Sequence, residues 1–130
     1  MAVTNGIHHL GLSVSKLEEA IEFFTEALEF NLVGRDEDYP AAFLKDESVV
    51  ITLWGTEKNA VPFDRKKNEG LHHVAFNVKD RGALESLYLR LIERTDITVE
   101  KEITAMSPGS NTRHFFIRIP GGPRVEFIAF

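Results

Sequence analysis

Apolar and polar residues alternate in one nine-residue pattern that occurs twice along the chain. Residues 6–14 read GIHHLGLSV and residues 70–78 read GLHHVAFNV, so both copies contain glycine, an aliphatic residue, two histidines and a closing valine. Alternation with a period of two is typical of a β-strand that has one buried face. Because a longer pattern of helical period follows each copy, the repeat indicates a duplicated supersecondary unit.

An amphipathic helix is predicted after each of these strands. In the first half, Ser15 and Glu18 have the spacing of a capping box, and the apolar stripe that follows consists of Leu17, Ala20, Ile21, Phe24 and Leu28. In the second half Asp80 is the expected N-cap, and the stripe consists of Leu84, Leu87, Tyr88, Leu91 and Ile92. Each stripe would cover the apolar face of the strand before it.

Three further strands are expected after each helix. Alternation and turn residues place them at residues 30–34, 41–44, 48–54, 97–103, 113–119 and 124–130, with loops at 35–40 and 104–111. Residues 56–69 show no useful period and form the expected connection. The prediction is therefore one α+β domain, residues 1–130, made of two βαβββ modules at 6–55 and 70–130 that are joined by a linker at 56–69.

Composition and charge exclude several classes of function. The chain has 130 residues, a net charge of −5 and no cysteine, so disulfides and thiolate metal sites are ruled out. With no long basic run, nucleic acid and anionic membranes are not the expected partners. No apolar run is long enough to span a bilayer and the first residues do not resemble a signal peptide, which favours a cytoplasmic protein.

The two histidine pairs are the first candidates for chemistry. In an alternating strand, His9 would share a face with Gly11 and Ser13, and His73 would share a face with small residues in the same way. Small neighbours leave room for a bound group, so His9 and His73 are the candidates, and His8 and His72 are interpreted as structural. The alternative is that each histidine is an ordinary strand residue whose ring is bonded to a backbone carbonyl.

The repeated strand order, with a histidine near the start of each copy and a glutamate near the end of the last strand, resembles the vicinal oxygen chelate superfamily. That group contains glyoxalase I, extradiol dioxygenases, fosfomycin-resistance enzymes, methylmalonyl-CoA epimerase and bleomycin-resistance proteins. The resemblance is carried by residues 9–14, 73–76, 116–122 and 125–127 and covers almost the whole chain. It implies a half-open mixed β-barrel with the helices outside.

The resemblance also implies a metal site. Carried over by position, it makes His9, His73 and Glu126 the ligands of one divalent ion, Fe²⁺, Mn²⁺, Ni²⁺ or Zn²⁺. The fourth position of the family falls on Thr52, whose neutral hydroxyl is a poor ligand, so three protein ligands are expected. Such an ion keeps open positions and would chelate a small-molecule substrate with vicinal oxygens for dioxygenase-like, lyase or transferase chemistry.

Residues around the expected ion are candidates for the remaining roles. His114, Phe116 and Arg118 share one face of an alternating strand; if that face lines the site, His114 would exchange protons and Arg118 would hold an anionic group. A Glu126 carboxylate that leaves the ion would be a second possible base. Thr52, Trp54 and Phe116 are the expected substrate contacts, with Phe43 in the same apolar wall. The alternatives place the polar residues on a solvent-exposed face and the aromatic residues in the core.

Two other functions remain open at this point. One is a metal-free small-molecule-binding protein of the bleomycin-resistance type, and the other is a ligand-sensing or scaffolding domain whose metal is only structural. A homodimer is the expected assembly, because open sheet edges favour pairing. The modules would pair either within one chain or between two chains.

Overall fold

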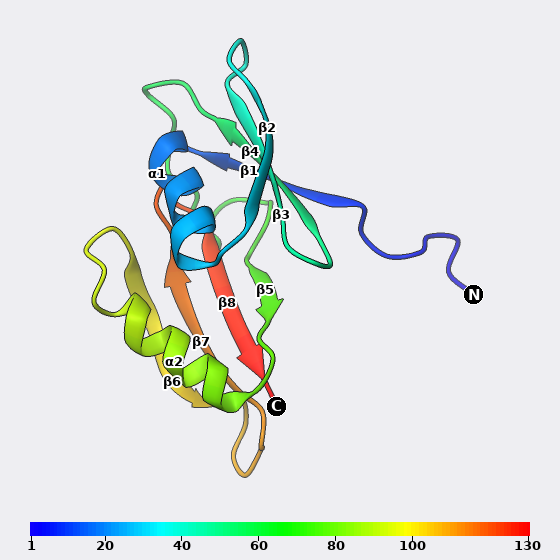
Figure 1. The fold of residues 1–130 in the computed structure, drawn as a ribbon, viewed down its shortest axis with the longest axis vertical. Helices are drawn as coiled ribbons and strands as arrows, with labels where there is room; N and C mark the ends of the chain where they lie inside the picture. The colour runs from blue at the N-terminus through cyan, green and yellow to red at the C-terminus, as the bar shows by residue number, and fades with distance from the viewer. The chain divides into compact units, whose positions relative to one another are not determined.

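The computed structural model describes all residues 1–130 and divides into two compact units, Met1–Ala60 and Val61–Phe130. Both units have a strand, a helical segment and three more strands in the same order, which Figure 1 follows by colour. Each unit contains one four-stranded mixed sheet that does not close on itself. The predicted α+β class and the repeated βαβββ order are therefore confirmed.

The first unit is built on a sheet with strand order β1-β4-β3-β2. Its elements are β1 (His9–Val14), α1 (Leu17–Glu22), the π-helical turn η1 (Phe23–Ala27), β2 (Asn31–Asp36), β3 (Ala41–Lys45) and β4 (Val50–Gly55). Strand β1 is parallel to β4, whereas the β3 ladders to β4 and β2 are antiparallel. The two edges of the sheet are thus β1 and β2.

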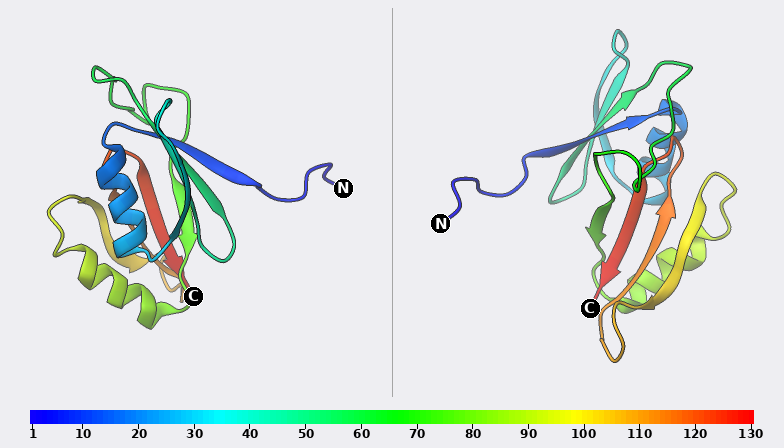
Figure 2. Two further views of the ribbon diagram at one scale, coloured as in Figure 1. Left: turned by 45° about the horizontal axis from the view of Figure 1, so that its top comes forward. Right: turned by 180° about the vertical axis from the view of Figure 1, so that it is seen from behind.

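The second unit repeats this topology with strand order β5-β8-β7-β6. Its elements are β5 (Val74–Asn77), α2 (Arg81–Leu91), β6 (Thr98–Ala105), β7 (Arg113–Arg118) and β8 (Arg124–Ala129). Strand β5 is parallel to β8, and β7 is antiparallel to both β8 and β6. Helix α2 packs against β7 and β8 and runs along one side of this sheet in both views of Figure 2.

The core follows the predicted periodicity. In β1, Leu12 and Val14 are buried while Gly11 and Ser13 are exposed, so the strand alternates as expected. The buried positions of the two predicted helical stripes are Ala20, Ile21, Phe24, Leu84, Leu87 and Leu91. Ile92 is an exception, because α2 ends at Leu91 and leaves the Ile92 side chain exposed.

The first helix differs from its prediction at both ends. Lys16, and not the predicted Ser15, is the N-cap residue, and the Lys16 side chain makes no capping hydrogen bond. After Glu22 the helix widens into the π-helical turn, where the Leu28 N–H donates to the Phe23 carbonyl. The wider turn lets the adjacent Phe23 and Phe24 both enter the core.

Strand boundaries also shift from their predictions. Strand β5 begins at Val74, so both His72 and His73 precede it, whereas a strand was predicted from residue 70. Gly70, where the strand was predicted to begin, has a φ of +154°, and a Cβ at this position would lie 2.8 Å from the Phe63 ring. Elsewhere the ladders are longer than predicted, because β2 extends through Asp36 and β6 through Ala105, into segments expected to be loops.

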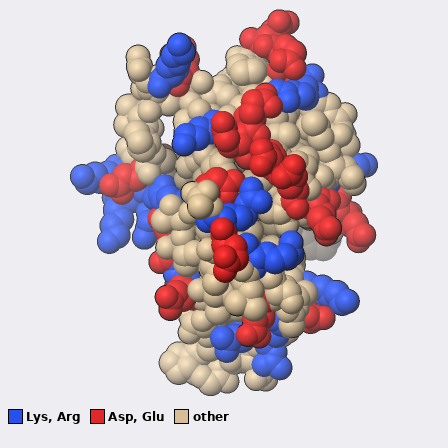
Figure 3. All heavy atoms as spheres, turned by 60° about the vertical axis from the view of Figure 1, so that its left-hand side comes forward, with Lys and Arg blue, Asp and Glu red and all other residues tan.

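Two surface findings complete the description. None of the helices combines the length and the apolar character needed to cross a membrane. On the face that Figure 3 shows, acidic and basic side chains are interspersed, and the acidic ones form the larger continuous groups. That face therefore offers no continuous basic surface, in keeping with the net charge of −5.

Candidate functional site

Glu126 lies at the centre of a polar cluster in the second unit. Its strand β8 runs between β5 and β7, where Glu126 pairs with Ala75 on one side and with Phe116 on the other. His73 stands one residue before the first pair of the β5–β8 ladder, and its Nε2 lies 3.1 Å from Glu126 Oε1. The ladder register thus brings together two of the three predicted metal ligands.

The second oxygen of this carboxylate is held by His114. The Nδ1 atom of His114 lies 2.6 Å from Glu126 Oε2, and both residues are only 5% exposed. Because an ionised carboxylate only accepts hydrogen bonds, the His114 Nδ1–H is the donor. In a neutral imidazole that donates through Nδ1, the other ring nitrogen, Nε2, carries a lone pair, and in this structure Nε2 is buried with no hydrogen-bond partner. His114 is therefore buried, which excludes the alternative that it lies on a solvent-exposed face of the strand.

His72 holds the opposite side of His73. The two Nδ1 atoms lie 2.8 Å apart, so one ring donates to the other. A His73 ring that donates through Nε2 to Glu126 would accept at Nδ1 from His72. The pKa of His72 is held below its ordinary value, first by desolvation and then by the positive charges of His73, Arg124 and Arg65. His72, which was interpreted as structural, thus bonds the candidate ligand through its ring.

Phe116 provides the apolar contact of the cluster. Its buried ring lies 5.2 Å from the His73 ring and 5.5 Å from the His114 ring, both edge-on, and the Arg124 guanidinium lies 3.9 Å above it. The side chain is 8% exposed. Phe116 therefore lies against both imidazoles and is buried, and its predicted contact with a substrate stays a prediction.

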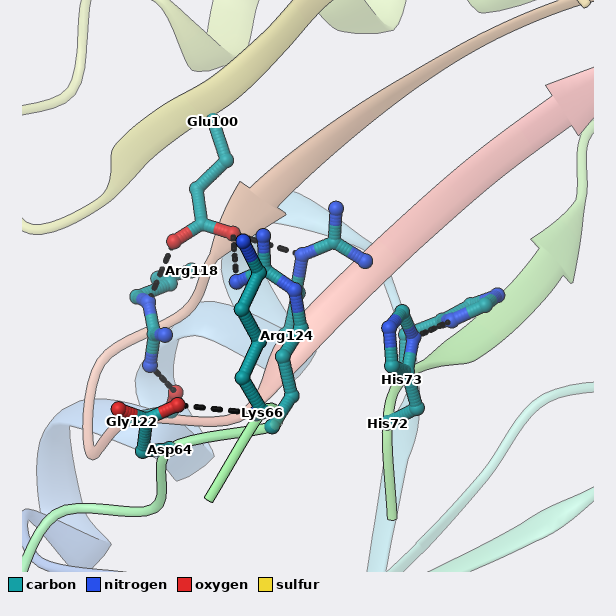
Figure 4. A network of polar contacts seen from close by, with 9 residues as sticks. Asp64, Lys66, His72, His73, Glu100, Arg118, Gly122 and Arg124 are labelled. Atoms are coloured by element: carbon teal, nitrogen blue, oxygen red, sulfur yellow. Dashed lines mark hydrogen bonds and ion pairs between the residues drawn. The ribbon is translucent and has the colours of Figure 1, made fainter. Parts of the chain in front are cut away.

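A network of arginines lies at the start of β8. Glu100 on β6 accepts hydrogen bonds from Arg118 Nε at 2.5 Å and from Arg124 Nε at 2.7 Å (Figure 4). Arg65 Nη1 lies 3.8 Å from Glu100 Oε1. Burial disfavours the ionised form of Glu100, but the two hydrogen bonds and the guanidinium charges outweigh it and hold the pKa below its ordinary value. Arg118, predicted to hold an anion, is thus already paired.

The remaining predicted site residues lie in the first unit. His9 begins β1, and its Nδ1 is 2.9 Å from the Nδ1 of His8, the same arrangement as in the second histidine pair. Thr52 pairs with Gly11 as Glu126 pairs with Ala75, so the two residues hold the same register position. Its Oγ1 accepts a 2.8 Å hydrogen bond from the Trp54 indole N–H. The Trp54 ring also contacts Tyr39 and Phe43.

The donor atoms of the second unit fit part of a metal site. No group of three or more His, Asp or Glu side chains in the structure has an arrangement that could hold a metal ion. However, two ligands about 2.1 Å from one ion, at roughly a right angle, are about 3 Å apart. The 3.1 Å between His73 Nε2 and Glu126 Oε1 matches this separation. These two residues therefore fit as neighbouring ligands, and a third donor is needed to complete a set.

Comparison with known proteins adds a family and a fold. The model of the Glyoxalase/Bleomycin resistance protein/Dioxygenase superfamily matches residues 6–127. Among solved structures, lactoylglutathione lyase from Agrobacterium tumefaciens aligns with a TM-score of 0.74 at 18% identity, covering 98% of this chain and 96% of that one. A possible glyoxalase from Bacillus cereus aligns with a TM-score of 0.71 at 21% identity, covering 96% and 99%. Identities this low show a shared fold alone.

Proposed function

This chain belongs to the Glyoxalase/Bleomycin resistance protein/Dioxygenase superfamily, and on that basis we propose that it is a small enzyme that uses one divalent metal ion to act on a substrate with vicinal oxygens. Members of the superfamily commonly use such an ion. The observation that carries the proposal is the buried Glu126 carboxylate with His73 Nε2 3.1 Å from its Oε1. The resident ion would be Fe²⁺, Mn²⁺, Ni²⁺ or Zn²⁺, all of which accept imidazole and carboxylate ligands.

His73 and Glu126 would hold this ion, and His9 is the proposed third ligand. Support for His9 comes from the duplication, since it precedes Gly11 as His73 precedes Ala75 in the matching ladders. It would come from the same chain or from a second copy. When bound, a divalent ion with open positions supplies Lewis-acid stabilisation of negative charge on substrate oxygens, worth several kcal/mol. Thr52 is excluded from the ligand set because its hydroxyl is neutral and already bonded to Trp54.

His114 is the proposed proton-transfer residue. Glu126 orients its ring by accepting from Nδ1, which leaves the Nε2 lone pair as the proton acceptor. The same hydrogen bond would fix the direction of the Glu126 carboxylate, as outer-shell partners of metal ligands do. Phe116, lying between the two imidazoles, keeps the cluster apolar on one side and would contact the substrate. Trp54 and Phe43 are proposed as a further apolar wall for the substrate.

Metal analysis tests the proposal directly. Protein purified without chelator should contain about one divalent ion per chain, and Glu126→Gln should lose most of it, because an amide is a weaker ligand than a carboxylate. Glu102→Gln on β6 is the matched control, since this carboxylate is exposed and should leave the metal content unchanged. Wild-type protein that takes up none of the four metals at saturating concentration would refute a metal-dependent function.

One observation favours a second candidate, a metal-free small-molecule-binding protein of the bleomycin-resistance type. Both oxygens of Glu126 already have imidazole partners, so the buried carboxylate is satisfied without an ion. Under this alternative, treatment with a chelator and then with zinc should leave the melting temperature unchanged. Under the leading proposal zinc should raise it, because a ligand that binds only the folded state stabilises that state.

A homodimer is the proposed assembly. The edge strand β2 exposes Leu32 and Val33, which are 41% and 54% accessible, and unpaired edges with apolar side chains favour association. Light scattering after size exclusion should give a mass near twice 14.7 kDa. A mass of one chain over the whole accessible concentration range would contradict this assembly.

A further inference from the structure

Three arginines share a single carboxylate at the start of β8. Arg65, Arg118 and Arg124 all lie within 4 Å of Glu100, at 3.8, 2.5 and 2.7 Å. One negative charge against three positive ones leaves an excess of two positive charges in this network. Such an excess attracts an anion, and the attraction is strongest where the side chains are partly removed from water.

The two arginines bonded to Glu100 differ in the hydrogen bonding of their Nη1 atoms. Arg118 Nη1 donates to the Gly122 carbonyl at 3.1 Å, so this side chain is tied to the turn between β7 and β8. Arg124 Nη1 is buried and has no hydrogen-bond partner. An unsatisfied buried donor costs about 1–3 kcal/mol, and more on a charged group. Among the three arginines, Arg124 is thus the one with a buried donor that lacks an acceptor.

The Arg124 side chain is also held in a fixed direction. Its Nε donates to Glu100 on one side, while the guanidinium lies over the Phe116 ring at 3.9 Å, and the side chain is only 13% exposed. Two anchors of this kind restrict the side chain before any ligand arrives. A preorganised guanidinium loses less entropy on binding an oxyanion than a free one does.

Arg124 faces the proposed metal ligands. It is two residues before Glu126 on β8, and side chains at this spacing share a face of a strand. In Figure 4 Arg124 stands between Glu100 and the His72–His73 pair. The effect of its charge on the pKa of His72 is consistent with this proximity.

We propose that Arg124 binds an oxyanion of the substrate, a carboxylate or a phosphate, beside the vicinal oxygens that the ion held by His73 and Glu126 would chelate. This inference rests on the proposed function and narrows it to substrates that carry such an anionic group. Arg124 supplies a charge-assisted hydrogen bond through Nη1. Arg118, the residue that the sequence suggested for this role, instead supports the network by holding Glu100.

The test uses the full chain after chelator treatment, so that no ion can bind the probe. Inorganic phosphate and acetate are titrated in separate arms, and the arginine Nε–H resonances and the amides of His72 and His73 are followed by nuclear magnetic resonance. At least one probe should shift the Arg124 and His73 signals saturably. The arm with the tighter binding identifies the phosphate or the carboxylate as the preferred group.

The matched variants are Arg124→Gln and Arg90→Gln. Loss of a charged hydrogen bond predicts affinity about 10- to 100-fold weaker in Arg124→Gln. Arg90→Gln should stay within about threefold of wild type, because Arg90 is exposed on α2 and is not part of the Glu100 network. If Arg124→Gln does not fold, Arg124→Lys keeps the charge but loses the planar group, and should still weaken binding severalfold.

Equal affinity in wild type and the folded Arg124 variant would overturn the inference, and so would the absence of any shift at Arg124 with both probes. Metal content is measured on the same samples without chelator. Metal uptake without anion binding refutes only the role of Arg124. Anion binding without metal uptake refutes only the proposed metal-dependent function.

Discussion

The two units share one backbone plan but carry different chemistry at matching positions. In the first unit Thr52 pairs with Gly11 and Phe43; in the second unit Glu126 pairs with Ala75 and Phe116. Thr52 is bonded to a neighbouring indole, whereas Glu126 lies between two imidazoles. The duplicated ladder thus gives Thr52 and Glu126 the same register position, and the residue type at that position decides which polar partners it has.

The largest effect is expected from placing the carboxylate of the second unit into the first. Thr52 is 6% exposed and its only described side-chain partner is the Trp54 N–H, so Thr52→Glu would bury a charge without adequate partners. In chelator, the free energy of unfolding should fall by about 3–5 kcal/mol in urea denaturation. Thr52→Val, which loses only the hydroxyl, should cost about 1–3 kcal/mol. Equal stability of Thr52→Glu and wild type would contradict the assigned surroundings.

Comparing the histidines of the two units tests whether both contribute to the site. His9→Ala and His73→Ala should each lower zinc affinity by at least about a hundredfold in equilibrium dialysis, since losing an outer-shell partner alone costs about 10- to 100-fold. If His9→Ala binds zinc like wild type while His73→Ala does not, the second unit alone holds the ion. That result would remove His9 from the proposed ligand set.

The two helices should respond differently to loss of their N-cap side chains. The Asp80 carboxylate accepts from the Ala83 N–H at 2.8 Å, whereas Lys16 makes no capping hydrogen bond. Asp80→Ala should therefore lower the free energy of unfolding by about 1 kcal/mol. Lys16→Ala should change it by less than about 0.5 kcal/mol. Equal effects of the two substitutions in urea denaturation would show that the cap of α2 is not stabilising.

The smallest effect is a pH dependence of stability that differs between two ion pairs. Arginine partners lower the pKa of both Glu18 and Glu100 below their ordinary value of 4.5. A depressed carboxyl pKa stabilises the fold above the unfolded value, and that contribution disappears as the pH falls through the lower folded value. Glu100→Gln should thus cost about 1 kcal/mol or less near neutral pH, and almost nothing in acid below the folded pKa.

Glu18→Gln should have a smaller effect, because the Glu18 side chain is 68% exposed and the Glu100 side chain only 20%. Urea denaturation of both variants, from neutral pH to below the folded carboxyl pKa, measures how much free energy of unfolding each substitution costs at each pH. A cost of Glu100→Gln that grows as the pH is lowered would contradict the assigned shift.

Much of the fold could be predicted because its signals are local. Alternation in β1 and the apolar stripe of α2 are each set by residues close in sequence, and both match the structure except at Ile92, which lies past the end of the helix and is exposed. Strand limits were less predictable, since pairing begins where a partner strand is available. Strand β5 begins at Val74 and not at Gly70, and the Phe63 ring beside Gly70 lies outside the alternating pattern from which the strand was predicted.

The cluster itself was only partly visible in the sequence. His73 and Glu126 follow from their repeated frame and family resemblance, but the contact between His114 and Glu126 depends on the β7–β8 register. There His114 pairs with Ile128 and Glu126 with Phe116, so the two side chains meet diagonally. The sequence predicted that Arg118 would hold an anion, but it did not predict that Glu100 would bond to Arg118. Glu100 lies on β6 and Arg118 on β7, and the register shifts between these strands cannot be predicted from the alternation of residues.

The central claim is that Glu126 in the second unit holds a metal ion, and that Thr52, at the matching position of the first unit, does not. A crystal structure of the protein grown with Zn²⁺, with anomalous data at the zinc edge, tests it most directly. The expected result is an anomalous peak within about 2.3 Å of Glu126 and His73. A peak at Thr52 with none at Glu126, or no peak at saturating zinc, would contradict it.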